Sequence, residues 1–365
     1  MVMRIRAAVS REGVAAPVIE DMDLDAPGTG ELLVRMVATG ICHTDLNCHS
    51  GHGMPIRKPI VLGHEGAGVV DRVGDGVTGF AVGDHVVLSG ASCGTCPSCQ
   101  AAHPSYCDTG IPLNFGGRRI DGTSPLHKEG EAIAGSFFGQ SSFATHALVP
   151  PQTAVKIDPD VPLHLMGPLG CGMITGAGAV LEAFRMRPGQ SLAVFGTGGV
   201  GLAAVMAAKI AGAERIVAVD VDRSRLDLAL ELGATDAILS SADTAEQLRA
   251  IAPRGFDFSL NTTTAAAVFD LAFACLAKEG TAGVVTRPSG GWTPDMAALL
   301  AGGRKIHGIL GGSANPKTFI PMLVRYWRQG RFPFDRLITE FAFDDIEAAW
   351  HACESGSAIK AVLRM

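Results

Sequence analysis

The chain has 365 residues, 47% of them hydrophobic and 18% charged, so it is long enough for two domains with ample apolar cores. A net charge of −6 without a long lysine or arginine run argues against nucleic acid or an anionic membrane as the main partner. Neither a signal peptide nor an unbroken apolar span of about 20 residues stands out, which predicts a cytoplasmic protein.

The first 150 residues predict a β-rich domain. Short apolar runs at 31–40, 66–74 and 83–90 are separated by glycine, aspartate and proline turns. Such runs are typical of the short strands of an all-β region.

From Arg187 the pattern changes to strands that alternate with helices. We expect strands over 191–196, 215–220, 256–263 and 281–287, and helices over 198–213, 222–234 and 267–280. This alternation indicates a parallel sheet with right-handed crossovers. The tail from about Pro316 predicts amphipathic helices and a last strand over 359–365.

The segment "SCGTCPSCQAAHPSYC" holds four of the nine cysteines, spaced C-x2-C-x2-C-x7-C. In a reducing compartment, clustered thiols bind metal more often than they form disulfides. A redox pair is disfavoured because Pro97 and the turn residues predict a loop rather than the start of a helix, while an iron–sulfur cluster stays open. We expect a closed, structural zinc site with four ligands: Cys93, Cys96, Cys99 and Cys107.

The segment "AVFGTGGVG" contains G-x-G-x-x-G between a predicted strand and a predicted helix. Gly196 permits the tight turn, Gly198 lets the backbone approach a pyrophosphate, and Gly201 permits close packing of helix on strand. The expected cofactor-binding residues of this loop are Gly196, Gly198, Gly199, Val200 and Gly201.

An acidic residue, Asp220, follows nineteen residues after Gly201 at the end of the next strand. A carboxylate there binds the ribose hydroxyls and repels a 2′-phosphate, so the sequence predicts NAD rather than NADP. Arg225 is expected to lie against the adenosine ribose.

Three further residues form a second candidate metal set: Cys42 in "GICHTDLNCHSG", His64 in "LGHEGAG" and Cys171 in "PLGCGMITGAG". Two thiolates and one imidazole leave a fourth zinc position for water or substrate, which is typical of a catalytic site. Taken singly, each of these residues also fits an ordinary buried position.

With its neighbours included, the chain resembles a zinc-dependent alcohol dehydrogenase of the medium-chain dehydrogenase/reductase superfamily over its full length. "GHEGAGVVDRVGDGV" fits the zinc signature G-H-E-x2-G-x5-G-x2-V, and the four-cysteine segment and "GTGGVG" follow in order. "SCGTCPSCQ" and "SFFGQSSF" resemble the benzyl-alcohol branch.

The resemblance implies an α/β fold with two domains and an active site in the cleft between them. A GroES-like, β-rich catalytic domain with the zinc lobe would take residues 1–172 and 312–365, and a Rossmann domain with a doubly wound parallel sheet would take 173–311. It implies two zinc ions per chain, NAD, a small alcohol or aldehyde as substrate, and a homodimer or homotetramer.

The resemblance also assigns roles to single residues. Cys42, His64 and Cys171 bind the catalytic zinc, Asp45 orients His64, and Glu65 is an occasional further ligand. Thr44 accepts the proton of the substrate alcohol, and His43 and Lys360 contact the cofactor pyrophosphate.

One position departs from the family pattern. Asn47 stands where relatives carry a histidine that ends a proton relay, and an amide is no general base. His49 or His52 are the candidates to replace it, although each also fits an ordinary loop histidine.

Ser89, Phe137 and Phe138 are the expected substrate-pocket residues. Space at Ser89 and aromatic rings opposite suit a flat or extended primary alcohol, such as a benzyl, cinnamyl or terpene alcohol.

Two other functions remain open. A glutathione-dependent formaldehyde dehydrogenase, acting on S-(hydroxymethyl)glutathione, usually has an arginine where this chain has Ile111. A non-catalytic, zinc-stabilised NAD-binding sensor would not need the intact trio of metal ligands.

Overall fold

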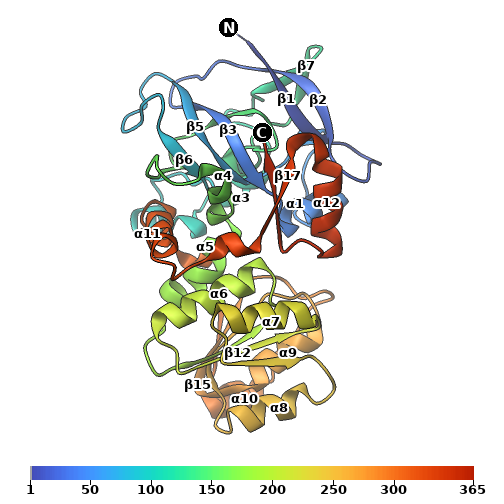
Figure 1. Ribbon diagram of the computed structural model, residues 1–365. Coiled ribbons are helices and arrows are strands. Elements are labelled where there is room, and N and C mark those ends of the chain that lie inside the picture. Colours follow the sequence, from blue (N-terminus) through green and yellow to red (C-terminus); the bar gives the residue numbers. More distant parts are fainter. Residues whose placement is uncertain (1) are drawn as a thin grey trace. The chain divides into compact units, whose positions relative to one another are not determined.

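The computed structural model describes residues 2–365, which fall into two compact units (Figure 1). Of the described residues, unit 1 comprises 2–171, Asn315–Val324 and Asp335–Met365, and unit 2 comprises Gly172–Ala314 and Arg325–Phe334. The functional division into 1–172 with 312–365, and 173–311, stays a prediction.

Unit 1 is built on two sheets, in agreement with the β-rich domain that its short, glycine-bounded apolar segments predict. A five-stranded antiparallel sheet has the order β4-β1-β2-β7-β8, with strands β4 (Ile60–Val61), β1 (Met3–Ser10), β2 (Val18–Leu24), β7 (Leu126–Lys128) and β8 (Glu131–Ile133). A seven-stranded sheet has the order β10-β6-β5-β3-β18-β17, with β9 paired to β3. Its strands are β10 (Ala154–Lys156), β6 (His85–Leu88), β5 (Glu65–Val73), β3 (Leu32–Gly40), β18 (Lys360–Arg364), β17 (Ile338–Ala342) and β9 (His146–Val149).

Short helices interrupt the strands of unit 1. They are α1 (His43–Ser50), α2 (Pro97–Gln100), α3 (Gly110–Phe115), α4 (Leu163–Met166), α12 (Ile346–Ser355) and the first part of α11 (Pro316–Arg328). Trp350 of α12 is buried in one core cluster with Phe143 and Ile41. Burial of each large side chain stabilises the fold by about 1.5–3 kcal/mol, which holds the C-terminal segment against strands that begin the chain.

Unit 2 contains a six-stranded, all-parallel sheet in the order β13-β12-β11-β14-β15-β16. The strands are β11 (Ser191–Phe195), β12 (Arg215–Asp220), β13 (Asp236–Leu239), β14 (Phe256–Asn261), β15 (Leu276–Val284) and β16 (Lys305–Gly308). The helices are α5 (Gly172–Gly178), α6 (Gly199–Ala211), α7 (Arg223–Leu232), α8 (Thr244–Ile251), α9 (Ala266–Ala274) and α10 (Met296–Gly302). This strand order is that of a dinucleotide-binding sheet, so the predicted fold class is confirmed.

The predicted boundaries around β15 are wrong, and the strand expected over 281–287 runs instead over Leu276–Val284. The helix expected over 267–280 ends at Ala274, and Leu276 already begins β15. The register between β14 and β15 shifts between Phe256 and Phe258. The first residues of β15 are therefore irregularly paired, and they are rich in helix-forming residue types. Sheet pairing outweighs local helix preference there.

Among the described residues, no single helix is long and apolar enough to span a bilayer. One pair of helices with a bend between them, Leu163–Gly170 and Gly172–Ala183, is together long and apolar enough for a span, by length and composition only.

Candidate functional site

The three residues of the second metal set lie together in unit 1. Cys42 precedes α1, His64 precedes β5, and Cys171 follows a 3-10 turn at Gly167–Gly170. Their ligand atoms all lie within 4.8 Å of one another. Segments far apart in the sequence therefore bring two sulfurs and one imidazole to a single point.

His64 is oriented by the carboxylate of Asp45, and both side chains are fully buried. Nδ1 of His64 lies 2.9 Å from Oδ1 of Asp45, which also accepts the N–H of Gly63 at 3.1 Å. Oδ2 of Asp45 accepts the N–H of Cys42 at 3.0 Å. The carboxylate thus keeps the proton of His64 on Nδ1 and leaves a lone pair on Nε2.

That second ring nitrogen, Nε2 of His64, is buried without a hydrogen-bond partner in the described chain. Hydrogen bonding to Cys171 lowers the pKa of the Cys42 thiol well below its ordinary value, and the same bond raises the pKa of Cys171. A metal ion bound by all three atoms would satisfy Nε2 and take the place of the shared thiol proton. Two sulfurs with one imidazole are the donor set that zinc prefers.

Glu65 lies behind this cluster in a buried ion pair with Lys360. Nζ of Lys360 lies 2.9 Å from each carboxylate oxygen of Glu65 and donates to the carbonyl of Ile41 at 3.2 Å. Burial raises the pKa of Glu65 to about 7, against the attraction of the ammonium group. The predicted contact of Lys360 with pyrophosphate stays a prediction, and so does that of His43, which is exposed.

The proton-relay candidates differ in their surroundings. The hydroxyl of Thr44 lies 3.9 Å from Sγ of Cys42, next to the metal ligands. His49 is buried, with Nδ1 2.7 Å from the hydroxyl of Ser10 and Nε2 3.0 Å from the carbonyl of Val14. Both of its ring nitrogens are therefore hydrogen-bonded within unit 1, and a relay through His49 stays a hypothesis.

The other two residues of that segment lie at the surface. Asn47 and His52 are exposed, and Nδ1 of His52 lies 2.9 Å from the hydroxyl of Ser50. Among the described residues, neither side chain is hydrogen-bonded to a metal ligand, so a relay through them stays a hypothesis.

The four cysteines of the predicted zinc loop also converge, with all sulfurs within 4.8 Å of one another: Cys93, Cys96, Cys99 and Cys107. The sulfurs of Cys93 and Cys99 are 4.0 Å apart, close to the about 3.8 Å that a tetrahedron of 2.3 Å zinc–sulfur bonds requires. None of the nine cysteines forms a disulfide in the described chain. Neither helix of the loop, Pro97–Gln100 or Pro104–Tyr106, has a buried residue, so this segment has no apolar core of its own.

Backbone N–H groups point at the sulfurs of this loop. The N–H groups of Thr95 and Cys96 donate to Sγ of Cys93 at 3.4 and 3.3 Å, and the N–H of Cys93 donates to Sγ of Cys107 at 3.3 Å. The Thr95 N–H is the main reason that the pKa of Cys93 is lowered to about 5. The loop is therefore prepared to hold thiolates around a cation.

In unit 2 the glycine loop opens α6 as predicted. A Cβ at Gly201 would meet the carbonyl of Gly196 at 1.9 Å, so only glycine permits this packing. Gly196 has a φ of +88°, whereas a Cβ at Gly198 would meet no atom within 4 Å. Gly198 is the N-cap of α6, so the open space lies where the N–H groups that begin α6 can donate hydrogen bonds to a phosphate. Gly199 and Val200 form the first turn.

Asp220 ends β12 beside that loop and is 8% exposed. Oδ2 accepts the N–H of Thr197 at 2.5 Å and its hydroxyl at 2.7 Å, while Oδ1 accepts the N–H of Val221 at 2.7 Å. The carboxylate is thus fixed at the carboxyl edge of the sheet, where dinucleotides bind in this fold. Nε of Arg225, in α7, lies 3.9 Å from Oδ2 of Asp222.

The three expected pocket residues have different environments. Phe137 is fully buried in the core, whereas Phe138 is half-buried and stacks on the His64 ring at 4.5 Å between centroids. Ser89 is buried, and its hydroxyl donates to the carbonyl of Gly170 at 2.7 Å. The sequence did not single out Gln140, which is fully buried next to these residues. Its only signal was its place in "SFFGQSSF".

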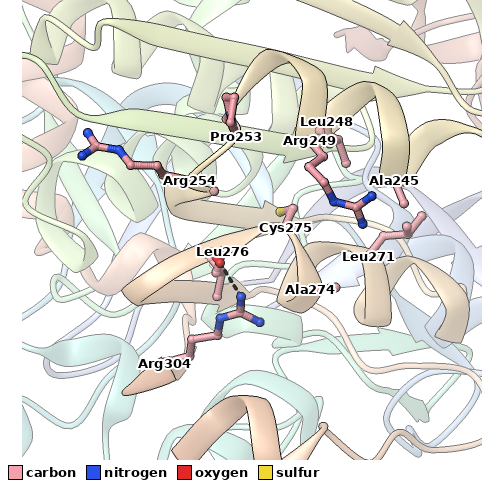
Figure 2. Close-up of a pocket in the computed structure, with 12 residues that line it drawn as sticks. Ala245, Leu248, Arg249, Pro253, Arg254, Leu271, Ala274, Cys275, Leu276 and Arg304 are labelled. Atoms are coloured by element: carbon pink, nitrogen blue, oxygen red, sulfur yellow. Dashed lines mark hydrogen bonds between the residues drawn. The ribbon is translucent and has the colours of Figure 1, made fainter. Parts of the chain in front are cut away.

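A cavity of about 210 Å³ lies elsewhere in unit 2 (Figure 2). It is lined by α8, by the C-terminal end of α9, by residues 252–255 before β14 and by Leu276 at the start of β15, at the sheet edge opposite to the glycine loop. Arg304, at its rim, donates to the carbonyl of Phe273 near the end of α9 and to that of Leu276 at the start of β15. None of its lining residues is a predicted site residue.

Comparisons with known proteins agree with this geometry. Residues 28–159 match the alcohol dehydrogenase GroES-like domain, and residues 199–326 match the zinc-binding dehydrogenase family. The chain is 45% identical to a geraniol dehydrogenase of Castellaniella defragrans, over 98% of this chain and 97% of that protein.

Two solved structures are similar over the full length. An alcohol dehydrogenase zinc-binding domain protein from Burkholderia ambifaria is 47% identical, with a TM-score of 0.97 and 100% of both chains covered. Benzyl alcohol dehydrogenase from Acinetobacter calcoaceticus is 40% identical, with a TM-score of 0.95, and 100% of this chain and 99% of that chain are covered.

Proposed function

Because the chain belongs to the zinc-dependent alcohol dehydrogenases of the medium-chain dehydrogenase/reductase superfamily, in the aryl and allylic branch, we propose that it oxidises a primary aromatic or allylic alcohol to the aldehyde with NAD. The observation that carries this proposal is the convergence of Cys42, His64 and Cys171 with Nε2 of His64 unpartnered. A chain that only bound nucleotide would not need this buried trio.

We propose two zinc ions per chain. Cys42, His64 and Cys171 would hold one and leave a fourth position open, and the four cysteines of the loop would close the other. Bound zinc would lower the pKa of the substrate alcohol, and NAD would accept the hydride from the carbon that carries the hydroxyl group.

The remaining steps fall to side chains of the chain itself. Asp45 holds His64 in the tautomer that can bind a metal, and Thr44 is the hydroxyl that accepts the proton of the alcohol. The reaction converts R–CH2–OH and NAD⁺ to R–CHO, NADH and one proton, which passes from Thr44 to water. The carboxylate of Asp220 binds the adenosine ribose and disfavours NADP.

Phe138 supports the substrate assignment. Its ring lies against His64, so a planar or unsaturated substrate group beside the metal would meet an aromatic face. The names of two relatives, geraniol dehydrogenase and benzyl alcohol dehydrogenase, point to the same substrate class. A homodimer or homotetramer and a cytoplasmic location stay predictions.

The test is a set of initial rates of NAD reduction with ethanol, benzyl alcohol, cinnamyl alcohol, geraniol, sorbitol and S-(hydroxymethyl)glutathione, with zinc measured on the same sample. We expect kcat/KM for benzyl or allylic alcohols to exceed that for ethanol about 100-fold, or about 2.7 kcal/mol in transition-state binding. Preference for the glutathione adduct would replace the proposed substrate. Zinc and NAD binding without turnover of any alcohol would favour a sensor.

A further inference from the structure

A loop formed by residues 137–143, here called the cradle loop, wraps the segment that carries His64. The backbone N–H groups of Ser142 and Phe143 donate to the carbonyls of Gly63 and Leu62 at 3.0 and 3.1 Å. The hydroxyl of Ser141 donates to the carbonyl of Val61 at 2.6 Å. The cradle loop therefore follows the backbone up to the residue before the metal ligand.

The cradle loop adopts a conformation that side chains disfavour. Phe138 and Ser141 have φ values of +52° and +47°, in the left-handed region that non-glycine residues rarely occupy. Such residues persist where the surroundings over-determine them, and they cluster at functional sites. Here the surroundings include the His64 ring, on which Phe138 stacks with an interplanar angle of 27°.

At the centre of the cradle loop, the side-chain amide of Gln140 forms hydrogen bonds through both its oxygen and its nitrogen. Oε1 accepts the N–H of Gly66 at 3.1 Å, and Nε2 donates to the carbonyls of His64 and Ser89, each at 3.1 Å. The side chain is 0% exposed, so no water competes for these bonds. One residue thus joins the start of β5 to the end of β6.

The connection continues to a second metal ligand. Ser89, whose carbonyl accepts from Gln140, donates its own hydroxyl to the carbonyl of Gly170 at 2.7 Å. Gly170 directly precedes Cys171, and a Cβ on Gly170 would meet the carbonyl of Leu88 at 2.0 Å. A continuous chain of buried hydrogen bonds therefore runs from His64 through Gln140 and Ser89 to the backbone beside Cys171.

We propose that Gln140 is a positioning residue that fixes the spacing between His64 and Cys171, two of the three ligands of the proposed catalytic zinc. The inference rests on the proposed function only in requiring a metal at this trio. Backbone anchoring of both ligands complements the side-chain anchoring of His64 by Asp45, because metal ligands bind tightly only when their mutual distances are held.

The test compares zinc retention in three variants of the full, zinc-loaded chain. Gln140→Met keeps the length of the side chain and removes all three hydrogen bonds. Ser89→Ala breaks only the bond to Gly170. Ser124→Ala is the control, because it removes another buried hydroxyl of unit 1, which donates to the carbonyl of Ile133.

We expect Gln140→Met to release one zinc ion per chain to a colorimetric chelator about 10–100-fold faster than the unmodified protein, the loss usual for outer residues of a metal site. The zinc ion held by the four-cysteine loop should be released as fast as from the unmodified protein, so it serves as an internal reference. Ser89→Ala should change the release rate in the same direction by a smaller factor, and it keeps the proposal testable if Gln140→Met does not fold.

A second readout reports ligand geometry rather than activity. With Co²⁺ in place of zinc, the visible absorption bands of the trio should shift in Gln140→Met and stay unchanged in Ser124→Ala. Unchanged zinc release and unchanged Co²⁺ bands in both Gln140→Met and Ser89→Ala would overturn the proposal, even if the variants melt at lower temperature. Loss of zinc retention without any alcohol turnover by the unmodified protein would keep the positioning role and reject the proposed function.

Discussion

The carboxylate of Asp45 accepts three hydrogen bonds, and all three require a group that only accepts. An asparagine has nearly the same shape, but its NH2 group would face one of the N–H donors of Cys42, Gly63 and His64. We therefore expect Asp45→Asn to lower zinc affinity at the trio about 10–100-fold. Competition with a chelator measures this affinity, and the exposed Asp75→Asn is the matched control. Equal affinities in the two variants would contradict the role of Asp45.

Asp220 provides a second prediction at the residue scale. Two unit charges about 4 Å apart repel by about 1–4 kcal/mol at effective dielectric constants of 80 to 20, so removal of the carboxylate charge should favour a 2′-phosphate. We expect Asp220→Asn to raise the ratio of kcat/KM for NADP to that for NAD about tenfold or more.

The companion variant Thr197→Val keeps the charge of Asp220 but removes one hydrogen bond to it. It should weaken NAD binding while preserving the preference for NAD. Initial rates with NAD and NADP measure both effects. If Asp220→Asn leaves the ratio of kcat/KM for NADP to that for NAD unchanged, another group selects the cofactor.

At the scale of elements, helix α1 is held by a buried histidine. His49 bonds Ser10 and the Val14 carbonyl and packs edge-on against Trp350 of α12 at 5.0 Å. Burial lowers the pKa of His49 below its ordinary value of 6.5, and Lys58 lowers it further, while the carbonyl of Val14 and Glu354 act in the opposite sense. The helix is therefore attached by a group that must stay neutral.

This lowered pKa gives the stability of the protein a pH dependence. The unfolded chain takes up the His49 proton at a higher pH than the folded chain does, so this contribution is complete above about pH 6.5 and decreases as the pH falls. We expect the free energy of unfolding to decrease by up to about 1.4 kcal/mol per pH unit from this group. Urea unfolding at pH 7.5 and 5.5 should show a smaller decrease in His49→Gln. The exposed His52→Gln should behave like the unmodified protein, and equal pH slopes in all three would contradict the prediction.

The elements also show what the sequence could predict. The glycine loop, the parallel strands and the four-cysteine loop were predictable because each depends on residues close together in the chain. The ion pair of Glu65 and Lys360 spans 295 residues, and the partners of Gln140 lie 51 to 76 residues away and are mostly backbone carbonyls. The contacts of Gln140 leave no pattern in the sequence, because every residue offers the same backbone atoms. The ion pair leaves none because its partners are so far apart along the chain. The end of α9 at Ala274 was missed because pairing of β15 with β14 overrides a local helix preference.

For the molecule as a whole, both proposed metal sites lie entirely within unit 1, while the glycine loop and Asp220 lie within unit 2. The four-cysteine loop has no apolar core, and Nε2 of His64 is a buried acceptor without a hydrogen-bond partner among the described residues. Metal removal should therefore loosen one unit and leave the other folded, because binding stabilises the structure that contains the site.

Hydrogen exchange followed by mass spectrometry, with and without chelator, measures this difference peptide by peptide. We expect faster exchange over 42–65, 92–109 and 167–171 after zinc removal, and unchanged exchange in β11, β12 and β14, whose parallel pairing needs no metal. NAD should still protect residues 196–201 in the zinc-free protein. Faster exchange throughout unit 2 would contradict this and would mean that the two units unfold as one, so that zinc stabilises the nucleotide-binding sheet as well as its own ligands.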